Sequence, residues 1–550
     1  MFGLEKIASK IEIPPEGVGA DLAIPCFREK PEDVAEKIRG LNNPLFGSVV
    51  VTGRYVNISF NLNALTEHVL HEVMTKKESY GWNASGAGKT VMLEYSAPNI
   101  AKPMHMGHAR NNAIGHALAN IYKANGYTVI TTNHFGDWGM SLAKIMLAFQ
   151  KWGDRKAFKK DPIRTLLDLY VRMTKEIKSS PELEDEAREL FRKLEGGDVE
   201  LRALWQEFRD ISVKNFERVY ALFGINFDLW HGESFYETFI KEAVDEALVK
   251  GAAAYGDPTS PSGLRGAGPL TTMASSGQGR PVVVNLDKFG LPSFLLVKSD
   301  GASLYSARDI AVGRWRLKEY PQAEKIIYVV GHEQELYLRQ IFKTLGLMGY
   351  PEEKFKHVSY GVVTINGKKI STREGGIVFL EDGLKEAVVK TKGIKEVGVG
   401  AILYNMLSMG REHDIAFSWD AALSIQGNSA PYIQYAYVRA KAILEKAGDV
   451  SASLPTNHYP LITPSSHEAR LLKRIAEFPQ AVRQAYSLDA PHIIATFLNE
   501  FAQEFSRFYD AVPVLEVGEA RALRLALVVA SAHVIKNGLW LLGIEVPERM

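Results

Sequence analysis

A strand pattern, a turn, a long helical pattern and a second strand pattern follow one another between residues 90 and 150. The first strand, TVMLEYS, is short, apolar and β-branched at its start. The stretch NNAIGHALANIYKANGY then places Ala113, Ile114, Ala117 and Leu118 on one helical face, and Gly126 fits a helix C-cap. TVITTNHFG follows as the second strand. This order predicts the first strand–helix–strand unit of a doubly wound parallel sheet, and therefore an α/β fold.

The turn and the start of that helix carry His105-Met106-Gly107-His108. In doubly wound sheets, ligands bind at the carboxyl ends of strands, where the positive ends of helix dipoles face phosphates. Two histidines three residues apart in a first helical turn face the same way. We expect them to donate hydrogen bonds to a triphosphate while pyrophosphate is displaced, and Gly107 to let a flat adenine approach the backbone.

A second motif, Lys369-Ile370-Ser371-Thr372-Arg373, follows the strand-like stretch HVSYGVVTI. A lysine on a small, polar, glycine-flanked loop can reach phosphates and neutralise charge as pyrophosphate leaves. Stretches of this kind are common in turns. Only the combination with the first motif makes it a specific signal of nucleotide chemistry.

The length of the chain and its patterns predict several domains. It has 550 residues, more than one hydrophobic core holds. We expect an N-terminal α/β domain over 1–88, a catalytic domain over 89–410 with an insertion at about 145–295, and an all-helical domain over 411–550.

Composition excludes some classes of protein. Cys26 is the one cysteine, so a disulfide framework and a cysteine-based structural zinc site are both excluded. The net charge of +1 is too small for a strongly basic chain, although basic patches can still bind nucleic acid. No signal peptide is apparent and no run of about 18 apolar residues occurs, so we expect a soluble cytoplasmic protein without a membrane span.

The two motifs, in this order, resemble the His-Ile-Gly-His and Lys-Met-Ser-Lys-Ser signatures of class I aminoacyl-tRNA synthetases. The stretches SAPNIAKPMHMGHARNN, NHFGDWGM, SDGASLYSARDI and YVVGHEQELYLRQ resemble segments of arginyl-tRNA synthetases, and the likeness covers essentially the whole chain. It implies a Rossmann-type catalytic domain and a monomer. It also implies an ATP-dependent ligase that converts arginine to arginyl-adenylate and transfers it to the 3′ end of tRNA(Arg), with Mg²⁺ arriving on ATP and no metal site of its own.

The resemblance also implies roles for single residues. A planar guanidinium with five donors requires acidic and amide acceptors. The arginine-binding residues would be Glu233, Tyr305 and Asp309 around the guanidinium, with Glu94, Asn99 and Gln334 at the amino-acid end. The catalytic residues would be His105, His108, Lys369 and Lys102, and ATP would be bound by His105, Gly107, His108, Lys369 and Ser371.

Two departures from the family pattern stand out. Thr372 replaces the second lysine of the Lys-Met-Ser-Lys-Ser signature, and we expect Lys102 to supply that missing positive charge. Met140 and Ser141 stand where the family usually has Thr-Gln, which puts any role of that glutamine in doubt. Asp137, just before them, could contact substrate or the arginine pocket, or it could form a turn, and both interpretations stay open.

RNA binding is predicted at both ends of the chain. Single-stranded bases stack on aromatic side chains beside basic ones. The candidates for tRNA contacts are Tyr432, Tyr435, Arg439 and Met550 at the anticodon, and Asn57 and Phe60 at the tRNA elbow. Three rival functions stay open: a class I synthetase for another amino acid, a small-molecule adenylyltransferase, and a non-catalytic RNA-binding protein that kept the fold.

Overall fold

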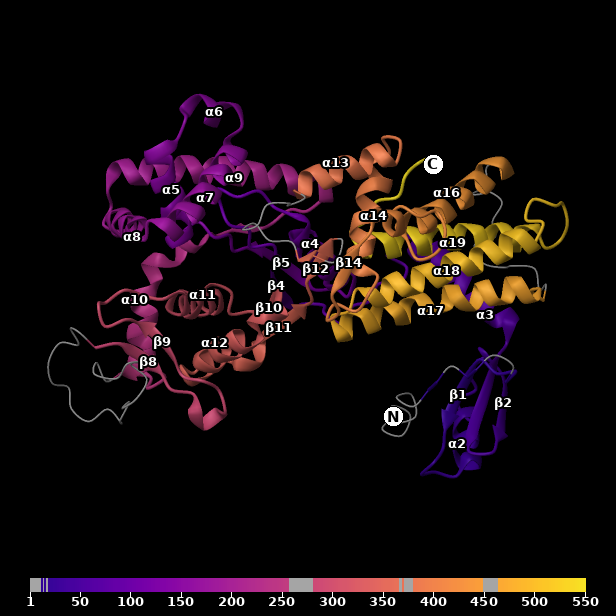
Figure 1. Cartoon of the computed structure of the whole chain (residues 1–550). Helices are drawn as coiled ribbons and strands as arrows, with labels where there is room; N and C mark the ends of the chain where they lie inside the picture. Colours follow the sequence, from indigo (N-terminus) through magenta and orange to yellow (C-terminus); the bar gives the residue numbers. More distant parts are fainter. Residues whose placement is uncertain are drawn as a thin grey trace.

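The computed structural model describes residues 11–12, 14–15, 18–256, 280–365, 368–369, 379–448 and 463–550 (Figure 1). Three clusters of buried apolar side chains lie within these residues. The largest runs without a break from the central sheet into the C-terminal helices, the second lies under the sheet beside α10 and α11, and the third fills the N-terminal unit.

The N-terminal unit stands apart from the rest of the molecule at the lower right of Figure 1. Its antiparallel sheet has the order β1-β3-β2, and one helix covers a face of it. The elements are β1 (Leu22–Pro25), α2 (Pro31–Arg39), β2 (Phe46–Thr52) and β3 (Tyr55–Phe60). Val34 and Ile38 of α2 pack on Val56 and Ile58 of β3, which is why apolar residues alternate along that strand. Helix α3 (Leu62–Lys76) then contacts α17 and α19.

The centre of the molecule is a five-stranded parallel sheet of order β11-β10-β4-β5-β6. Its strands are β4 (Thr90–Glu94), β5 (Thr128–Asn133), β6 (Leu229–Trp230), β10 (Ala323–Gly331) and β11 (Phe355–Tyr360). The chain builds outward from β4 in one direction through β5 and β6, and later in the other through β10 and β11. The carboxyl end of β4 is therefore the topological switch point, where ligands bind in such sheets. This confirms the predicted doubly wound catalytic domain.

Helix α4 (Met106–Ala124) connects β4 to β5, as the sequence predicts. The expected insertion is split in two, because β6 returns to the central sheet. The first part is a helical lobe, at the upper left of Figure 1, of α5 (Met140–Trp152), α6 (Arg155–Lys160), α7 (Pro162–Ser179), α8 (Glu182–Glu195) and α9 (Val199–Phe223). The second has a small antiparallel sheet, with α10 (Glu233–Val249), β7 (Ala254–Tyr255), β8 (Val282–Val284) and β9 (Phe294–Val297).

Two helices pack beside the second part of the insertion. A separate small sheet contains the start of the second motif. The helices are α11 (Tyr305–Glu319), packed along α10, and α12 (Glu335–Leu347). The small sheet has the order β13-β12-β14, with β12 (Val363–Ile365), β13 (Lys368–Lys369) and β14 (Ile415–Phe417). Helices α13 (Leu380–Lys390) and α14 (Lys395–Leu407) follow, and α14 packs on α4. Single 3-10 turns are η1 (Lys77–Ser79), η2 (Asp287–Phe289), η3 (His332–Gln334) and η4 (Glu352–Lys354).

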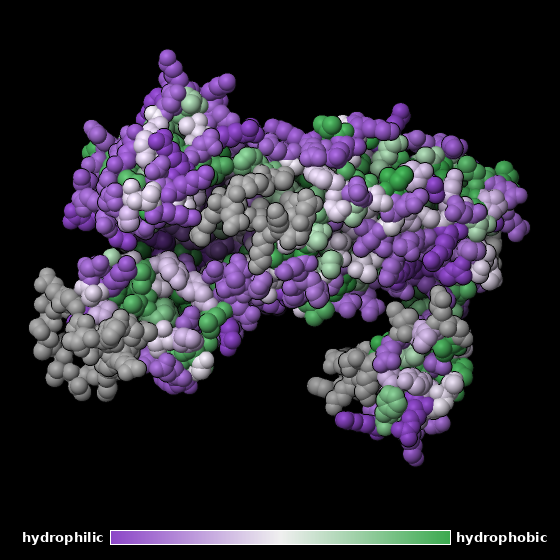
Figure 2. Space-filling view, in the orientation of Figure 1, coloured by the Kyte–Doolittle hydropathy of each residue, from purple (hydrophilic) through white to green (hydrophobic). Residues whose placement is uncertain are grey.

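The C-terminal part is helical, as predicted. Its helices are α15 (Trp419–Ala422), α16 (Ala430–Ala447), α17 (Ser466–Leu488), α18 (His492–Ala511) and α19 (Arg521–Leu541). Within the described ranges α19 alone is long and apolar enough to cross a membrane, but 67% of its apolar window is buried and it packs on α16, α17 and α18. It is placed as the core helix of this bundle. Figure 2 shows polar residues over most of the visible face, with apolar ones scattered among them.

Candidate active site

A strained turn connects β4 to α4 at the switch point. Ser96, Ala97 and Ala101 have φ angles of 77°, 48° and 59°, in the left-handed region that non-glycine residues rarely adopt. Backbone hydrogen bonds to and from Gly136 and a bond from the Ala101 amide to the Ser212 hydroxyl, at 2.8 Å, hold the turn in this form. Such strain persists only where the surroundings over-determine it, and it is concentrated at functional sites.

Asn99 lies in this turn with its amide against Gly136. A Cβ added at Gly136 would lie 2.3 Å from the Asn99 side-chain oxygen, so only glycine leaves room for Asn99 there. The predicted binding residue is thus placed by the close approach of two loops, one after β4 and one after β5.

His105 and His108 cap the start of α4 together. The His105 Nδ1 accepts the Gly107 amide at 3.1 Å, and the His108 Nδ1 accepts the His105 amide at 3.0 Å. Burial lowers the pKa of His105 to about 4 and that of His108 to about 3, so both rings are neutral at pH 7. Because each Nδ1 accepts, each proton sits on Nε2. The pair therefore presents two neutral N–H donors at the positive end of a helix.

A cavity of about 680 Å³ opens at the carboxyl ends of β4, β5 and β10. The structure brings all six predicted arginine-binding residues to its wall, together with one of the two histidines. They are Glu94, Asn99, His108, Glu233, Tyr305, Asp309 and Gln334. Polar lining residues that were not predicted include His134, Arg308, Glu333, Tyr337 and Tyr360. Four of these five lie in stretches that carry the family resemblance: His134 in NHFGDWGM, Arg308 in SDGASLYSARDI, and Glu333 and Tyr337 in YVVGHEQELYLRQ.

Two of the three predicted acidic residues already hold arginines of the protein. The Glu94 carboxylate accepts from the guanidinium of buried Arg316. Glu233 lies 3.4 Å from Arg308, and burial raises the pKa of Glu233 to about 7. Asp309 has no ion-pair partner among the residues that the structure describes, and burial raises its pKa as well.

The comparisons with known proteins agree with this geometry. A family model described as "tRNA synthetases class I (R), catalytic domain" matches residues 69–259 and 271–419, and one described as "DALR anticodon binding domain" matches 433–550. Relatives named arginine–tRNA ligase, from Clostridium botulinum and Clostridium perfringens, are 38% and 39% identical over 572 residues, covering 100% of this chain and 97% of each relative. The chain belongs to the class I arginyl-tRNA synthetase family. Membership makes it a ligase that joins arginine to tRNA.

Solved structures of arginyl-tRNA synthetases share the fold. The Thermus thermophilus arginyl-tRNA synthetase superimposes with a TM-score of 0.83 at 25% identity, covering 98% of this chain and 96% of that one. The Plasmodium falciparum enzyme gives 0.75 at 20% identity, covering 98% and 94%. Over 98% of its length, this chain therefore has the fold of solved arginyl-tRNA synthetases.

The second motif of the arginyl-tRNA synthetase signature is only partly described. Lys369 lies in β13, where its backbone pairs with Thr364 of β12. Ser371 lies outside the described residues. On the far side, Phe379 forms a β-bridge with His105, and the Leu380 amide donates to the Met104 carbonyl at 2.9 Å. The backbone at Phe379 and Leu380, which follows the second motif in the chain, is therefore paired with the backbone beside the first motif.

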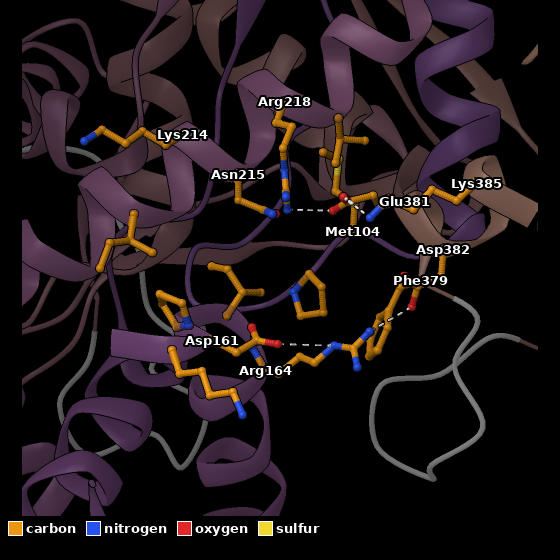
Figure 3. Close-up of a pocket in the computed structure, with 16 residues that line it drawn as sticks. Met104, Asp161, Arg164, Lys214, Asn215, Arg218, Phe379, Glu381, Asp382 and Lys385 are labelled. Atoms are coloured by element: carbon orange, nitrogen blue, oxygen red, sulfur yellow. Dashed lines mark hydrogen bonds and ion pairs between the residues drawn. The ribbon is translucent and has the colours of Figure 1, made fainter. Parts of the chain in front are cut away.

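Helix α13 is also held by ion pairs across a second cavity, of about 540 Å³, between α7, α9 and α13 (Figure 3). Arg164 lies 3.1 Å from Asp382, and Arg218 lies 2.7 Å from Glu381. These pairs connect the helical lobe to the helix that follows the lysine signature.

Lys102 does not line the main cavity. Its ammonium donates to the Ser141 hydroxyl at 2.8 Å and lies 3.8 Å from the centre of the Tyr170 ring. The residue expected to replace a family lysine therefore contacts Ser141, which is itself one of the positions where this chain departs from the family pattern.

Asp137 has a third role that neither sequence interpretation included. Its buried carboxylate accepts the Ser234 amide at 2.8 Å, the Ser234 hydroxyl at 2.7 Å and Arg209 Nε at 3.2 Å. It thereby fixes the start of α10, where Glu233 lies. A Cβ at Gly232 would come within 2.5 Å of this carboxylate, so the contact requires glycine.

The predicted tRNA contacts lie outside the main cavity, on the helical bundle and on the N-terminal unit. On the helical bundle the Arg439 guanidinium lies between two exposed aromatic rings, 4.9 Å from Tyr435 and 4.7 Å from Tyr509. Tyr432 packs partly against the core, and Met550 is exposed. Asn57 and Phe60 lie on β3 of the N-terminal unit, partly exposed.

Proposed function

We propose that the protein activates L-arginine with ATP, releasing pyrophosphate, and then transfers the arginyl group to the terminal ribose of tRNA(Arg). The observation that carries this proposal is the cavity at the carboxyl end of β4. There six residues from β4, α10, α11 and the loops after β4 and β10 line one wall together with His108, of the histidine pair that begins α4.

In the proposed complex, the guanidinium of arginine binds Asp309, with Tyr305 at the rim of the cavity. This role fits Asp309, because within the described part of the chain it is the acidic residue of the predicted set that has no ion-pair partner. Glu233 acts beside it through Arg308, and Glu94 through Arg316. Asn99 and Gln334 hold the amino-acid end, where they can accept from an ammonium and donate to a carboxylate.

The histidines bind the phosphates of ATP. Arginine's carboxylate attacks the α-phosphorus, and negative charge moves to the departing pyrophosphate. Two Nε2–H donors fixed by backbone hydrogen bonds stabilise this charge without rearrangement. Gly107 has no side chain beside His105, where a Cβ would lie 2.9 Å from the ring. Lys369 and Lys102 add positive charge, and Ser371 a hydroxyl. Mg²⁺ comes with ATP and is coordinated by its phosphates. No nucleophilic side chain is required.

In the proposed complex, the tRNA contacts the helical bundle and the N-terminal unit. Tyr432, Tyr435, Arg439 and Met550 contact the anticodon loop, and Asn57 and Phe60 contact the elbow. The exposed stack of Tyr435, Arg439 and Tyr509 supports the first assignment, because unpaired bases stack on such faces. We place the domain limits at 1–88, 89–410 and 411–550, and infer a cytoplasmic monomer.

The test is ATP–pyrophosphate exchange with each of the twenty amino acids, with and without bulk tRNA. Exchange with arginine alone supports the proposal, and a requirement for tRNA would show that tRNA binding and activation are coupled. Exchange with lysine or another amino acid would refute the arginine site but keep the class I reaction. Folded protein that gives no exchange would favour the non-catalytic alternative.

A further inference from the structure

Tyr337, in the first turns of α12, lines the main cavity and reaches across it to α11. Its hydroxyl donates a hydrogen bond to the Oδ2 of Asp309. Its ring lies 5.1 Å from the ring of Tyr305, at 49°. Two residues of the proposed guanidinium site thus contact one side chain from another helix.

The charges around Asp309 make that contact important. Arg308 adjoins it on α11, but the guanidinium of Arg308 is bound to Glu233 and Glu237. His134, Tyr337 and the charge of Arg308 favour the charged carboxylate, whereas burial and Glu94 disfavour it. Glu233 faces Asp309 with like charge. Burial dominates, so the pKa of Asp309 is raised.

We propose that Tyr337 is a positioning residue for arginine: its hydroxyl fixes one oxygen of Asp309 and leaves the other to accept the substrate guanidinium. This inference rests on the proposed function. Tyr337 acts as a donor throughout the working pH range, because burial and then the charge of Asp309 raise the pKa of its phenol. The bond therefore both orients the Asp309 carboxylate and favours its ionised form, which is the form that binds a guanidinium.

The test is Tyr337→Phe, which removes the hydroxyl and keeps the ring against Tyr305. The matched control is Tyr350→Phe. The Tyr350 hydroxyl also donates to a carboxylate, that of Glu246 at 2.8 Å, but Tyr350 does not line the cavity. Steady-state ATP–pyrophosphate exchange, with tRNA present, gives KM for arginine, KM for ATP and kcat from pH 5.5 to 8.5 for the wild type and both variants.

We expect Tyr337→Phe to raise KM for arginine about tenfold or more, the effect of losing a hydrogen bond to a charged group. KM for ATP should stay unchanged. The acid limb of kcat/KM for arginine should move to higher pH, because Asp309 loses a donor that favours its charged form. Tyr350→Phe should match the wild type in all three quantities.

Unchanged KM for arginine and an unmoved acid limb in Tyr337→Phe would overturn the inference. So would equal increases in KM for arginine and for ATP, which indicate a general disturbance of the site. A wild type that does not exchange with arginine would instead refute the proposed function, and the two failures are therefore distinguishable.

Discussion

Replacing Arg316 by methionine should destabilise the protein strongly, because it leaves a buried carboxylate without its counter-charge. The side chains of Arg316 and Glu94 are 1% and 8% exposed. Burial by itself lowers the pKa of Arg316, but the charge and hydrogen bond of Glu94, together with Tyr328 and Tyr236, outweigh burial, and the net direction is upward. Each of the two charges is thus stable in the interior only because the other is there.

The size of the effect follows from the burial. Removing one partner of a buried ion pair costs about 3–5 kcal/mol, mostly because the remaining charge loses its compensation. Removing both charges costs less, since nothing charged then stays in the interior. Arg316→Met should therefore lower the free energy of unfolding by about 3–5 kcal/mol. Adding Glu94→Gln to that variant should recover part of the loss.

Urea unfolding at pH 8, followed by tryptophan fluorescence, measures Arg316→Met, Glu94→Gln and the double variant against the wild type. The control is Lys89→Met, which breaks the exposed pair of Lys89 and Glu324, at 3.2 Å and with side chains 47% and 37% exposed. That loss should stay below about 1 kcal/mol. If Arg316→Met costs no more than this control, or if the double variant is as unstable as the sum of the two single ones, the reasoning is refuted.

Three further predictions follow from the site and the core. His108→Asn should lower kcat for exchange about 100- to 1000-fold, the effect of losing one donor to developing charge, with little change in KM for arginine; a large rise in that KM would contradict it. Because burial lowers the pKa of His105 to about 4 and of His108 to about 3, while unfolded histidines titrate near 6.5, the unfolded state binds protons first as pH falls. Stability should therefore decrease between about pH 6.5 and 4, by up to ~1.4 kcal/mol per pH unit for each histidine, and the slope of the urea midpoint should be shallower in His108→Asn. Gly115→Ala should lower the melting temperature, since its Cβ would lie 2.1 Å from the buried Tyr95 ring and overpacking costs about 1–3 kcal/mol, whereas Gly518→Ala, with nothing within 4 Å, should not.

The first strand–helix–strand unit of the catalytic domain could be predicted because its signals lie close together in the sequence. The apolar period of residues 113–121 and the flanking strand runs lie within 60 residues, and they became β4, α4 and β5. The strand β6 was not predicted. It has only two residues, Leu229 and Trp230, and it pairs with β5 only after the whole helical lobe has intervened. The sequence of a two-residue strand carries no period, so the split of the insertion could not be derived from it.

The prediction of the site also depended on whether its signals were local. The motif at the start of α4 predicted the two histidines, and the family resemblance predicted Asn99 and the acidic residues of α10 and α11. The partners of those acidic residues were missed. Arg316 lies 222 residues from Glu94 in the chain, and nothing in the spacing of either residue indicates the other. Which carboxylates already pair with a cation is a tertiary property, and it supports the proposed role of Asp309.

The presence of two arginines beside a site for arginine has a physical reason. Three carboxylates in one cavity repel one another, and without compensation some of them would take up protons and lose their attraction for a cation. Arg316 pairs with Glu94, whereas Arg308 is shared between Glu233, at 3.4 Å, and Glu237, at 2.6 Å, and burial raises the pKa of Glu233 to about 7. Of the predicted acidic set, Asp309 is the carboxylate without an ion-pair partner among the described residues, which fits the proposed role of binding the substrate guanidinium.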